Sequence, residues 1–510
     1  MRKELFIKLA LLFVVVLFLY SLIDRIPHID DAWLGEHAYW MSKLGYVKSE
    51  LMRGITRQET RLLCHHKLFT IQGAFFIKLF GFKLITLKSL TLLYFILFLI
   101  IYYLRFFKKF FSPNEFYLSL LLLISNALIF ENSFVYRPEI AVMTLGFISY
   151  LCIDRILGNK ANQIFYAAIG GTFAGLSFAT HLNGIIFPVA GFILLCWNRK
   201  ILLAFTFGLF TIPTILIYFY DFTSIYNLNF WLYQINEAPS LDGISKLPIL
   251  ISFIQNLLDE HLRFFHSPFE ITFSILFLST FIVTYKKLKE YKNLIRYAGL
   301  LVFFLALFSV HKASYYMIVY LPYLIIIITL SYRELTKQTL LNGLLFKRVT
   351  FQKALNYCTV VFVMYVAINS FYNIQTSTNK FVKYESKDIV NKYISGLTDS
   401  CKIVAPLTFV FDEILDFKSI QGDLCYTELQ KGNKSIYKEG FLQLTKRFDI
   451  DYIILSRESM NQLGFDDFSN NKFLKNDCEL IVKNDSFCII KNKKTYLSNA
   501  FVYDDNDLNR

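Results

Sequence analysis

Three acidic side chains lie where a carboxylate could act as a general base. Asp30 and Asp31 are adjacent and follow closely on the first long apolar run, and Glu139 opens a later one. A carboxylate beside a hydroxyl can take its proton while the oxygen attacks an electrophile. Acidic residues also cap helices and complement the positive end of the helix dipole. Both explanations stay open for these three residues.

Basic side chains occur in the same segments. His65, His66 and Lys67 form a short run, Arg137 directly precedes an apolar run, and Lys312 stands in a short linker between two others. Cations of this kind make strong charge-assisted contacts with phosphate and can stabilise a departing phosphate group. The alternative for the His-His-Lys run is contact with anionic lipid headgroups. The cysteine and histidine spacing around this run does not match a zinc site.

Two further polar residues belong to the candidate substrate-binding set. His181 begins a tight turn in which Asn183-Gly184 is ordinary turn chemistry. A hydrogen-bonded histidine at the membrane interface is the alternative explanation for His181. Tyr315 follows the linker that contains Lys312 and is considered together with it.

Long apolar runs must position these residues. Of the 510 residues, 55% are hydrophobic and only 18% are charged. Leu5–Ile23, Ile201–Tyr220 and Ala354–Tyr372 each approach the ~20 residues that a membrane-crossing helix needs. This composition excludes a disordered chain, a collagen-like chain and a disulfide scaffold.

The hydropathy pattern predicts a polytopic α-helical membrane protein with about 11 transmembrane helices. The expected spans are 5–23, 88–104, 116–133, 138–154, 164–180, 182–197, 201–220, 269–285, 294–310, 314–331 and 354–372. Two amphipathic pieces in the long segment 24–87 are predicted to lie in the membrane interface. They are the stretches 33–44 and 74–82.

The basic residues predict the orientation. The chain carries a net charge of +14, yet 374–510 holds 19 basic and 20 acidic residues, which leaves 34 basic and 19 acidic residues for the remainder. The excess falls in alternate short linkers, as the positive-inside rule requires, so we expect the N-terminus in the cytoplasm. An odd number of spans then places 374–510 outside it. This distribution argues against nucleic-acid binding.

Two domains are therefore expected. Residues 1–373 form the transmembrane domain, and 374–510 form an extracytoplasmic α/β domain in which short apolar runs alternate with polar helical stretches. In an oxidising compartment, disulfides Cys478–Cys488 and Cys401–Cys425 are predicted.

The order of the motifs resembles that of a known family. The chain is similar to the dolichyl-phosphate-mannose protein mannosyltransferase-like family (glycosyltransferase family 39-like) of the glycosyltransferase C superfamily, including bacterial relatives that modify envelope glycans. The matching residues are Asp30-Asp31-Ala32 with Ala38-Tyr39 and Met41, His65-His66-Lys67-Leu68 before Phe80-Gly81, Glu139, and Lys312 with Tyr315-Tyr316 and Pro322. Asp31 stands where the family has Glu, and both prolines of its Pro-Pro-Leu motif are missing. The second departure leaves open which of His65, His66 and Lys67 contacts phosphate.

The resemblance implies an inverting glycosyltransferase of the bacterial inner membrane. It would move a hexose or pentose from a polyprenyl-phosphate donor to a glycan, lipid or protein acceptor at the outer face, among membrane lipids as further partners. Asp30 would be the base, and Asp31 and Glu139 would orient the acceptor or the sugar. The candidates for the donor phosphate are His65, Lys67, Arg137 and Lys312. Neither a cofactor nor a metal is required by these residues.

Two other functions remain possible on this sequence. A polytopic transporter or lipid flippase would also have many spans with scattered charge. Such proteins often carry inverted repeats and broken helices near the bilayer midplane. Here the polar residues cluster at the ends of apolar runs. A scaffolding protein that binds partners through residues 374–510 would leave the paired acids unexplained.

Overall fold

The computed structural model describes residues 2–237, 249–310, 312–341, 345–380, 390–394, 401–413, 417–423, 438–456, 460, 478–483 and 487–493. The chain divides into two compact units, each described by itself. The helical unit comprises Met1–Val47, Leu63–Trp231 and Ser245–Val382. The sheet unit comprises Lys48–Leu62, Leu232–Ile244 and Lys383–Arg510. The domain boundary after residue 373 stays a prediction.

Every apolar run that was expected to span the membrane coincides with helical structure. The helices in these runs are α1 (Arg2–Ser21), α4 (Leu84–Phe106), α5 (Pro113–Ser125), the short α6 (Ala127–Asn132), α7 (Glu139–Leu157), α8 (Gln163–Thr180), α9 (Ile186–Trp197), α10 (Ile201–Leu216), α14 (Pro268–Thr284), α15 (Lys292–Phe308), α16 (Leu321–Leu341) and α17 (Leu345–Thr378). Within the described residues, six stretches are long and apolar enough to cross a membrane. The polytopic helical membrane fold is thus confirmed, and the count of about 11 spans stays a prediction.

The outer surface of the helices explains their composition. On α10, Leu202, Phe205 and Leu209 recur every three or four residues and are 72%, 64% and 65% exposed. Such a stripe would be unfavourable in water but suits contact with lipid hydrocarbon. The opposite face of the same helix buries Ala204 and Phe207 in the core. Apolar residues on both faces therefore indicate a helix between lipid and protein.

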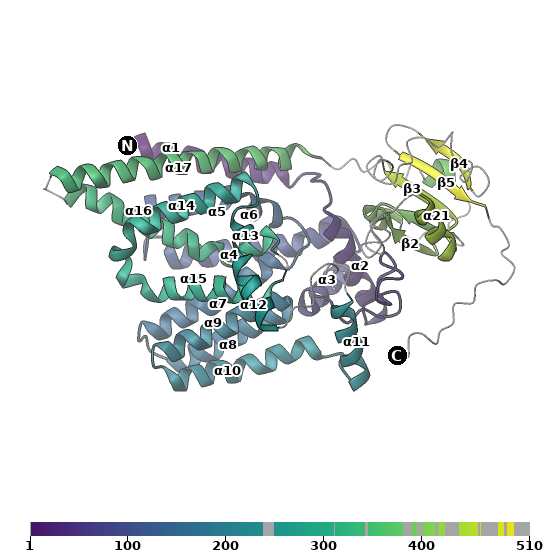
Figure 1. Cartoon of the computed structure of the whole chain (residues 1–510), viewed down its shortest axis with the longest axis horizontal. Helices are drawn as coiled ribbons and strands as arrows, with labels where there is room; N and C mark the ends of the chain where they lie inside the picture. The colour runs from purple at the N-terminus through teal and green to yellow at the C-terminus, as the bar shows by residue number, and fades with distance from the viewer. Residues whose placement is uncertain are drawn as a thin grey trace. The chain divides into compact units, whose positions relative to one another are not determined.

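Helices α7, α8, α9 and α10 stack side by side (Figure 1). Gly171 and Gly175 of α8 permit the close approach of α10. A Cβ atom at Gly171 would lie 2.1 Å from the carbonyl oxygen of Phe207, and one at Gly175 would lie 2.0 Å from Thr214 Oγ1. Small residues four apart let two membrane helices pack backbone to backbone.

Shorter helices connect the long ones. They are α2 (Ile29–Leu44), α3 (Lys67–Phe80), α11 (Ile225–Asn236), α12 (Ile249–Leu258), α13 (His261–Phe264) and the 3-10 helix η5 (Ser314–Val319). The two amphipathic pieces expected in 24–87 occur as α2 and α3. Helix α2 begins with a capping box between His28 and Asp31, and it ends at Gly45, whose φ of 76° is left-handed.

The sheet unit contains a five-stranded sheet in the order β2-β1-β3-β5-β4. The strands are β1 (Lys402–Ala405), β2 (Ser419–Gly422), β3 (Tyr452–Ser456), β4 (Cys478–Lys483) and β5 (Phe487–Asn492), and helix α21 (Lys438–Arg447) precedes β3. Strand β1 runs parallel to β2 and β3, whereas β5 runs antiparallel to β3 and β4. The small C-terminal α/β fold expected from the sequence is therefore present.

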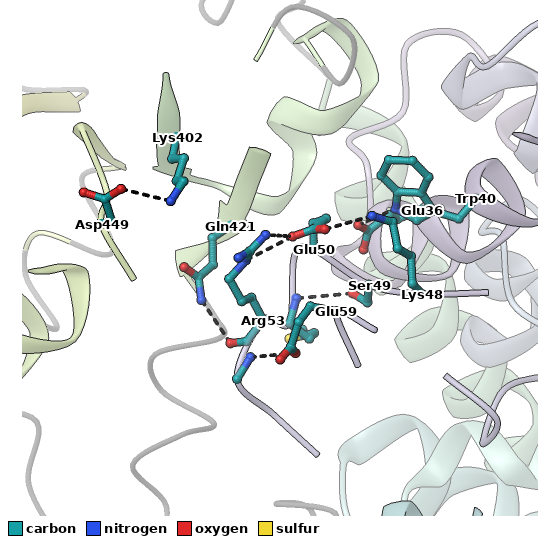
Figure 2. A network of polar contacts seen from close by, with 12 residues as sticks. Glu36, Trp40, Lys48, Ser49, Glu50, Arg53, Glu59, Lys402, Gln421 and Asp449 are labelled. Carbon is teal, nitrogen blue, oxygen red and sulfur yellow. Dashed lines mark hydrogen bonds and ion pairs between the residues drawn. The ribbon is translucent and has the colours of Figure 1, made fainter. Parts of the chain in front are cut away.

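Segment 48–62 comes from the connection between α2 and α3, yet it is part of the sheet unit (Figure 2). The backbone N–H of Gly422 donates to the carbonyl of Leu51 over 3.0 Å. The side-chain amide of Gln421 donates to the carbonyl of Arg53 over 3.0 Å, and Arg53 also pairs with Glu50. These bonds connect segment 48–62 to the last two residues of β2.

The disulfide expected between Cys478 and Cys488 is wrong. Strands β4 and β5 do form the expected hairpin, but their register places Cys478 opposite Asn492 and Cys488 opposite Lys483. The Sγ atom of Cys478 lies 3.3 Å from Asn492 Oδ1. A cysteine at each start of two antiparallel strands ends up at opposite ends of the ladder. The other predicted pair includes Cys425, which lies outside the described residues.

Candidate functional site

A cluster of charged side chains forms where the start of α2 meets the start of α7. The guanidinium of Arg137 donates from Nη2 to Glu139 Oε1 over 2.8 Å and from Nε to Glu139 Oε2 over 3.2 Å. Its Nη1 forms an ion pair with Asp30. Arg137 therefore joins two carboxylates that are more than 100 residues apart in the sequence.

Asp31 contacts a different set of groups, in the interior of the protein. Its side chain is completely buried and accepts hydrogen bonds from the backbone N–H groups of Tyr136 (2.6 Å) and His28 (2.7 Å). Lys88 Nζ of α4 lies 3.3 Å from the same carboxylate. Asp31 thus attaches the start of α2 to α4 and to the segment before α7, and this arrangement aims Asp30 at Arg137.

The two adjacent aspartates differ in acidity. Burial raises the pKa of Asp30, but its interaction with His28 and the positive charge of Arg137 outweigh burial, so its pKa lies below the ordinary value. Burial dominates at Asp31 and raises its pKa, in spite of Lys88 and two backbone hydrogen bonds. His28 and Arg137 therefore favour the charged form of Asp30, which is the form that can accept a proton.

Aromatic rings extend the cluster on one side. The Arg137 guanidinium carbon lies 3.8 Å from the centre of the Tyr315 ring, which is a cation–π contact. Tyr316, the next residue of η5, lies beside Tyr315 and makes an edge contact with His181. The His66 ring at the start of α3 stacks on His181 with centroids 4.6 Å apart.

Burial favours the neutral form of both stacked histidines. Burial lowers the pKa of His181 to about 4, and burial followed by the neighbouring charge of His181 lowers the pKa of His66 as well. The Nδ1 atom of His181 accepts a hydrogen bond from the backbone N–H of Asn183 over 2.9 Å, which requires that this nitrogen carry no proton.

A second ionic group continues from Tyr316. The Arg263 guanidinium lies 5.7 Å from the Tyr316 ring centre and pairs with Glu260 over 3.1 Å. Lys312 Nζ lies 3.2 Å from the other Glu260 oxygen and donates to the carbonyl groups of Ala306 and Ser309. Burial raises the pKa of Glu260 and lowers that of Lys312, so burial disfavours the charged form of each side chain.

Lys67 lies apart from this chain of contacts. Its side chain is fully buried, and its Nζ donates to both carboxylate oxygens of Asp221 at 2.8 and 2.7 Å. The rings of Tyr218, Tyr220 and Phe222 surround the same nitrogen at 5.4 to 5.8 Å. His65 contacts Thr70 on α3 through Nδ1 at 3.3 Å and is buried as well.

The structure thus brings seven of the ten predicted site residues into one continuous set of contacts. These are Asp30, Arg137, Glu139, His66, His181, Tyr315 and Lys312. Asp31 holds the start of α2 in place beside this set. His65 contacts Thr70 of α3, and Lys67 pairs with Asp221. Within the described residues, no group of three histidine, cysteine or acidic side chains could hold a metal ion.

Sequence reasoning missed several partners. Asp221 follows directly on an apolar run, and Lys88 was counted as the first residue of a span; each is an isolated charge at a helix end that signals a buried partner. Glu260 and Arg263 are three residues apart on one helical face and form an ion pair that the sequence pattern did not single out.

Solved structures share this fold. ArnT from Cupriavidus metallidurans in the apo state superimposes with a TM-score of 0.55 at 12% identity, over 97% of this chain and 99% of that one. The structure of the same protein bound to undecaprenyl phosphate gives 0.54 at 12% identity, over 96% and 98%. The oligosaccharyltransferase AglB from Archaeoglobus fulgidus, in complex with an inhibitory peptide and a dolichol-phosphate, gives 0.52 at 11% identity, over 89% and 70%.

The likeness concerns the fold alone, since so few residues are identical. The superpositions confirm a fold shared with these proteins, and the resemblance to the glycosyltransferase C superfamily stays a prediction from the motif order. No protein-family model matches the chain, and no curated protein matches it in sequence.

Proposed function

We propose that this chain moves a sugar from a polyprenyl-phosphate donor to a hydroxyl of a glycan, lipid or protein acceptor. The reaction forms a bond between the acceptor atom and the anomeric carbon. It breaks the bond between that carbon and the phosphate oxygen, and the acceptor proton passes to a base. One displacement with one base inverts the anomeric configuration.

Asp30 is the proposed base. The observation that carries this assignment is exposure: the Asp30 side chain is 19% exposed, whereas those of Glu139 and Asp31 are 3% and 0% exposed. Asp30 is therefore the most accessible of the three carboxylates to an acceptor. Asp31 acts as a positioning residue through its hold on the start of α2, and Glu139 shares Arg137 with Asp30.

Arg137 and Lys312 are the proposed contacts of the donor phosphate. Each keeps some exposed surface, at 11% and 9% of the side chain, and Tyr315 lies between them in the chain of contacts. Positive charge beside the departing phosphate stabilises the transition state. Lys67 has 0% exposure, so it reaches a ligand only if Asp221 releases it.

The test is Asp30→Asn. Removing a general base costs about 10²–10⁴-fold in rate. Asn keeps the size of the side chain and can still accept a hydrogen bond from Arg137, so the thermal unfolding temperature should change little. Transfer of radiolabelled sugar from polyprenyl-phosphate donors in membranes measures the rate, normalised to folded protein.

The matched control is Asp154→Asn. Asp154 also pairs with an arginine, Arg105 at 2.7 Å, but it lies near the opposite end of α7. This control should transfer sugar at the wild-type rate. If Asp30→Asn is folded and equally active, the base is another residue, with Glu139 next. Movement of a lipid across vesicles without any glycosyl transfer would instead support a flippase.

We propose that the site and the sheet unit lie outside the cytoplasm, in the bacterial inner membrane. The support is the alternation of basic linkers, because cytoplasmic loops carry the excess of Lys and Arg. Reporter fusions after Asn198 and Leu288 should report the cytoplasm, and one after Arg510 should report the outer side. A cytoplasmic signal from the fusion after Arg510 would contradict the orientation.

A further inference from the structure

A cavity lies at the opposite end of α7 from the candidate site. It has a volume of about 760 Å³ and is enclosed by the last turns of α4 and α7, the start of α15 and Ile326 of α16. The candidate site lies near the first turn of α7, Glu139, whereas this cavity includes Asp154 and Arg155 of its last turn. The two places are therefore separated by the length of a long helix.

Positive charge dominates the lining of this cavity. The lining includes Arg105, Lys109, Arg155 and Lys160, against the two carboxylates Asp154 and Glu290. Arg105 is held by Asp154 at 2.7 Å, and Arg155 donates to the hydroxyl of Tyr166 over 2.8 Å. Lys109 and Lys160 are exposed at its edge. The balance of charges favours an anionic group.

The cavity also offers an unsatisfied hydrogen-bond acceptor. Within the described residues, the Oδ1 atom of Asn293 is buried and has no hydrogen-bond partner. Asn293 lines the same cavity. A buried acceptor without a donor is costly, so a ligand that supplies a hydroxyl would be stabilised there.

An apolar track leads away from the cavity along α4. Leu93, Leu97, Ile100 and Leu104 are spaced three or four residues apart and are 54%, 39%, 51% and 58% exposed. Leu104 belongs both to this track and to the cavity lining. Side chains at this spacing share one face of a helix. A fatty acyl chain can lie along that face while its headgroup occupies the cavity.

We propose that this cavity binds an anionic glycerophospholipid. Its phosphate would lie among Arg105, Lys109, Arg155 and Lys160, a glycerol hydroxyl would donate to Asn293, and one acyl chain would cover the α4 track. Basic pockets between membrane helices bind anionic headgroups in this way. The proposal does not depend on glycosyl transfer, because it uses none of the residues of the candidate site.

The test uses the full chain purified in detergent and phosphatidylglycerol as the probe. Native mass spectrometry at increasing lipid concentration should give a tighter Kd for phosphatidylglycerol than for phosphatidylcholine with the same acyl chains. Lys109→Gln with Lys160→Gln should weaken phosphatidylglycerol binding about 25-fold, at about fivefold for each lysine near an anionic headgroup. Added salt should also weaken it.

The control is Lys286→Gln with Lys287→Gln, which removes two exposed lysines from the connection between α14 and α15 that are not part of the cavity lining. This variant should bind like the wild type. Equal affinity for the two lipids, or equal loss in both double variants, would overturn the proposal. Inorganic phosphate that competes as well as the lipid would indicate a soluble anion instead, and tighter binding of undecaprenyl phosphate at these lysines would overturn the choice of lipid.

Discussion

At the scale of single residues, two neighbouring aspartates have different environments. Asp30 lies in the second position of α2 and faces Arg137, whereas Asp31 faces Lys88 and the backbone of Tyr136. Successive residues of a helix point about 100° apart, so one can face Arg137 while the next faces the core. The proposed division into a base and a positioning residue follows from that geometry.

The neutral histidine pair predicts a pH dependence of stability. The folded-state pKa of His181 is about 4, below its unfolded value near 6.5. The unfolded chain therefore binds more protons in this range, so stability is complete above pH 6.5 and falls as the pH drops toward 4. The loss should approach about 3 kcal/mol at the low end, since each pKa unit corresponds to about 1.4 kcal/mol.

Thermal unfolding of the solubilised chain between pH 7.5 and 4.5 measures this dependence. His181→Gln should reduce its slope, because glutamine does not titrate. His261→Gln is the matched control, because it makes the same substitution at an exposed histidine. The same slope in His181→Gln as in the wild type would show that other groups cause it.

At the scale of elements, the packing of α8 against α10 depends on glycines, which have no side chain to keep the helices apart. Gly171 lies against the backbone of Phe207, and its carbonyl accepts a hydrogen bond from Thr211 over 3.1 Å. Backbone at that distance cannot move aside as a flexible side chain can. The end of α8 carries His181, so a shift of this helix would also disturb the stacked pair with His66.

Gly171→Ala should therefore destabilise the protein. Overpacking of a tight interface costs about 1–3 kcal/mol, although alanine alone would favour the helix. The control is Gly299→Ala on α15, where a Cβ atom meets nothing within 4 Å and should be neutral or slightly stabilising. Unfolding temperatures in detergent compare the two variants; equal stability would contradict the close packing of α8 and α10.

At the scale of the whole molecule, segment 48–62 belongs to the sheet unit, although the residues before and after it in the chain belong to the helical unit. It follows α2, which carries Asp30, and precedes α3, which carries Lys67. Its carbonyls at Leu51 and Arg53 accept hydrogen bonds from β2, and those at Thr56 and Arg61 accept hydrogen bonds from Gln234. Gly54 within it has a φ of 86°, which favours glycine, and a Cβ atom there would meet Phe448 at 2.6 Å. Contacts within the sheet unit thus hold the connection between α2 and α3.

A chain that ends at Val382 should expose this segment to protease. Without Gln421 and Gly422, the carbonyls of Leu51 and Arg53 lose their donors, and local opening becomes easier. Trypsin should cleave after Arg53 or Arg57 at least about 10-fold faster than in the full chain, as measured by mass spectrometry of the fragments.

Cleavage at the exposed Lys286 and Lys287 provides the internal control for that experiment. Its rate should be the same in both chains. Equal cleavage after Arg53 in the truncated and full-length chains would mean that the contacts with β2 do not hold the segment.

Local patterns in the sequence were enough for the helical membrane fold and for the small α/β tail. Apolar runs near the length of a bilayer and short alternating strands depend only on neighbours in the chain, so hydropathy finds them. The order of Asp30, His66, Glu139 and Lys312 along these runs also indicated which ends of the helices carry polar groups. The same reasoning predicted the β4–β5 hairpin but not its register.

Only the tertiary structure decided which polar groups meet. The pairs Asp30–Arg137 and Lys67–Asp221 join residues 107 and 154 positions apart, and nothing in the local pattern encodes such a distance. The tertiary structure also decides how exposed each charged side chain is. Asp31 and Lys67 are fully buried, whereas Asp30 remains partly exposed. The cost of burying a charge without a partner makes these pairings necessary once the helices have packed, because an isolated charge in an apolar interior is too unfavourable to persist.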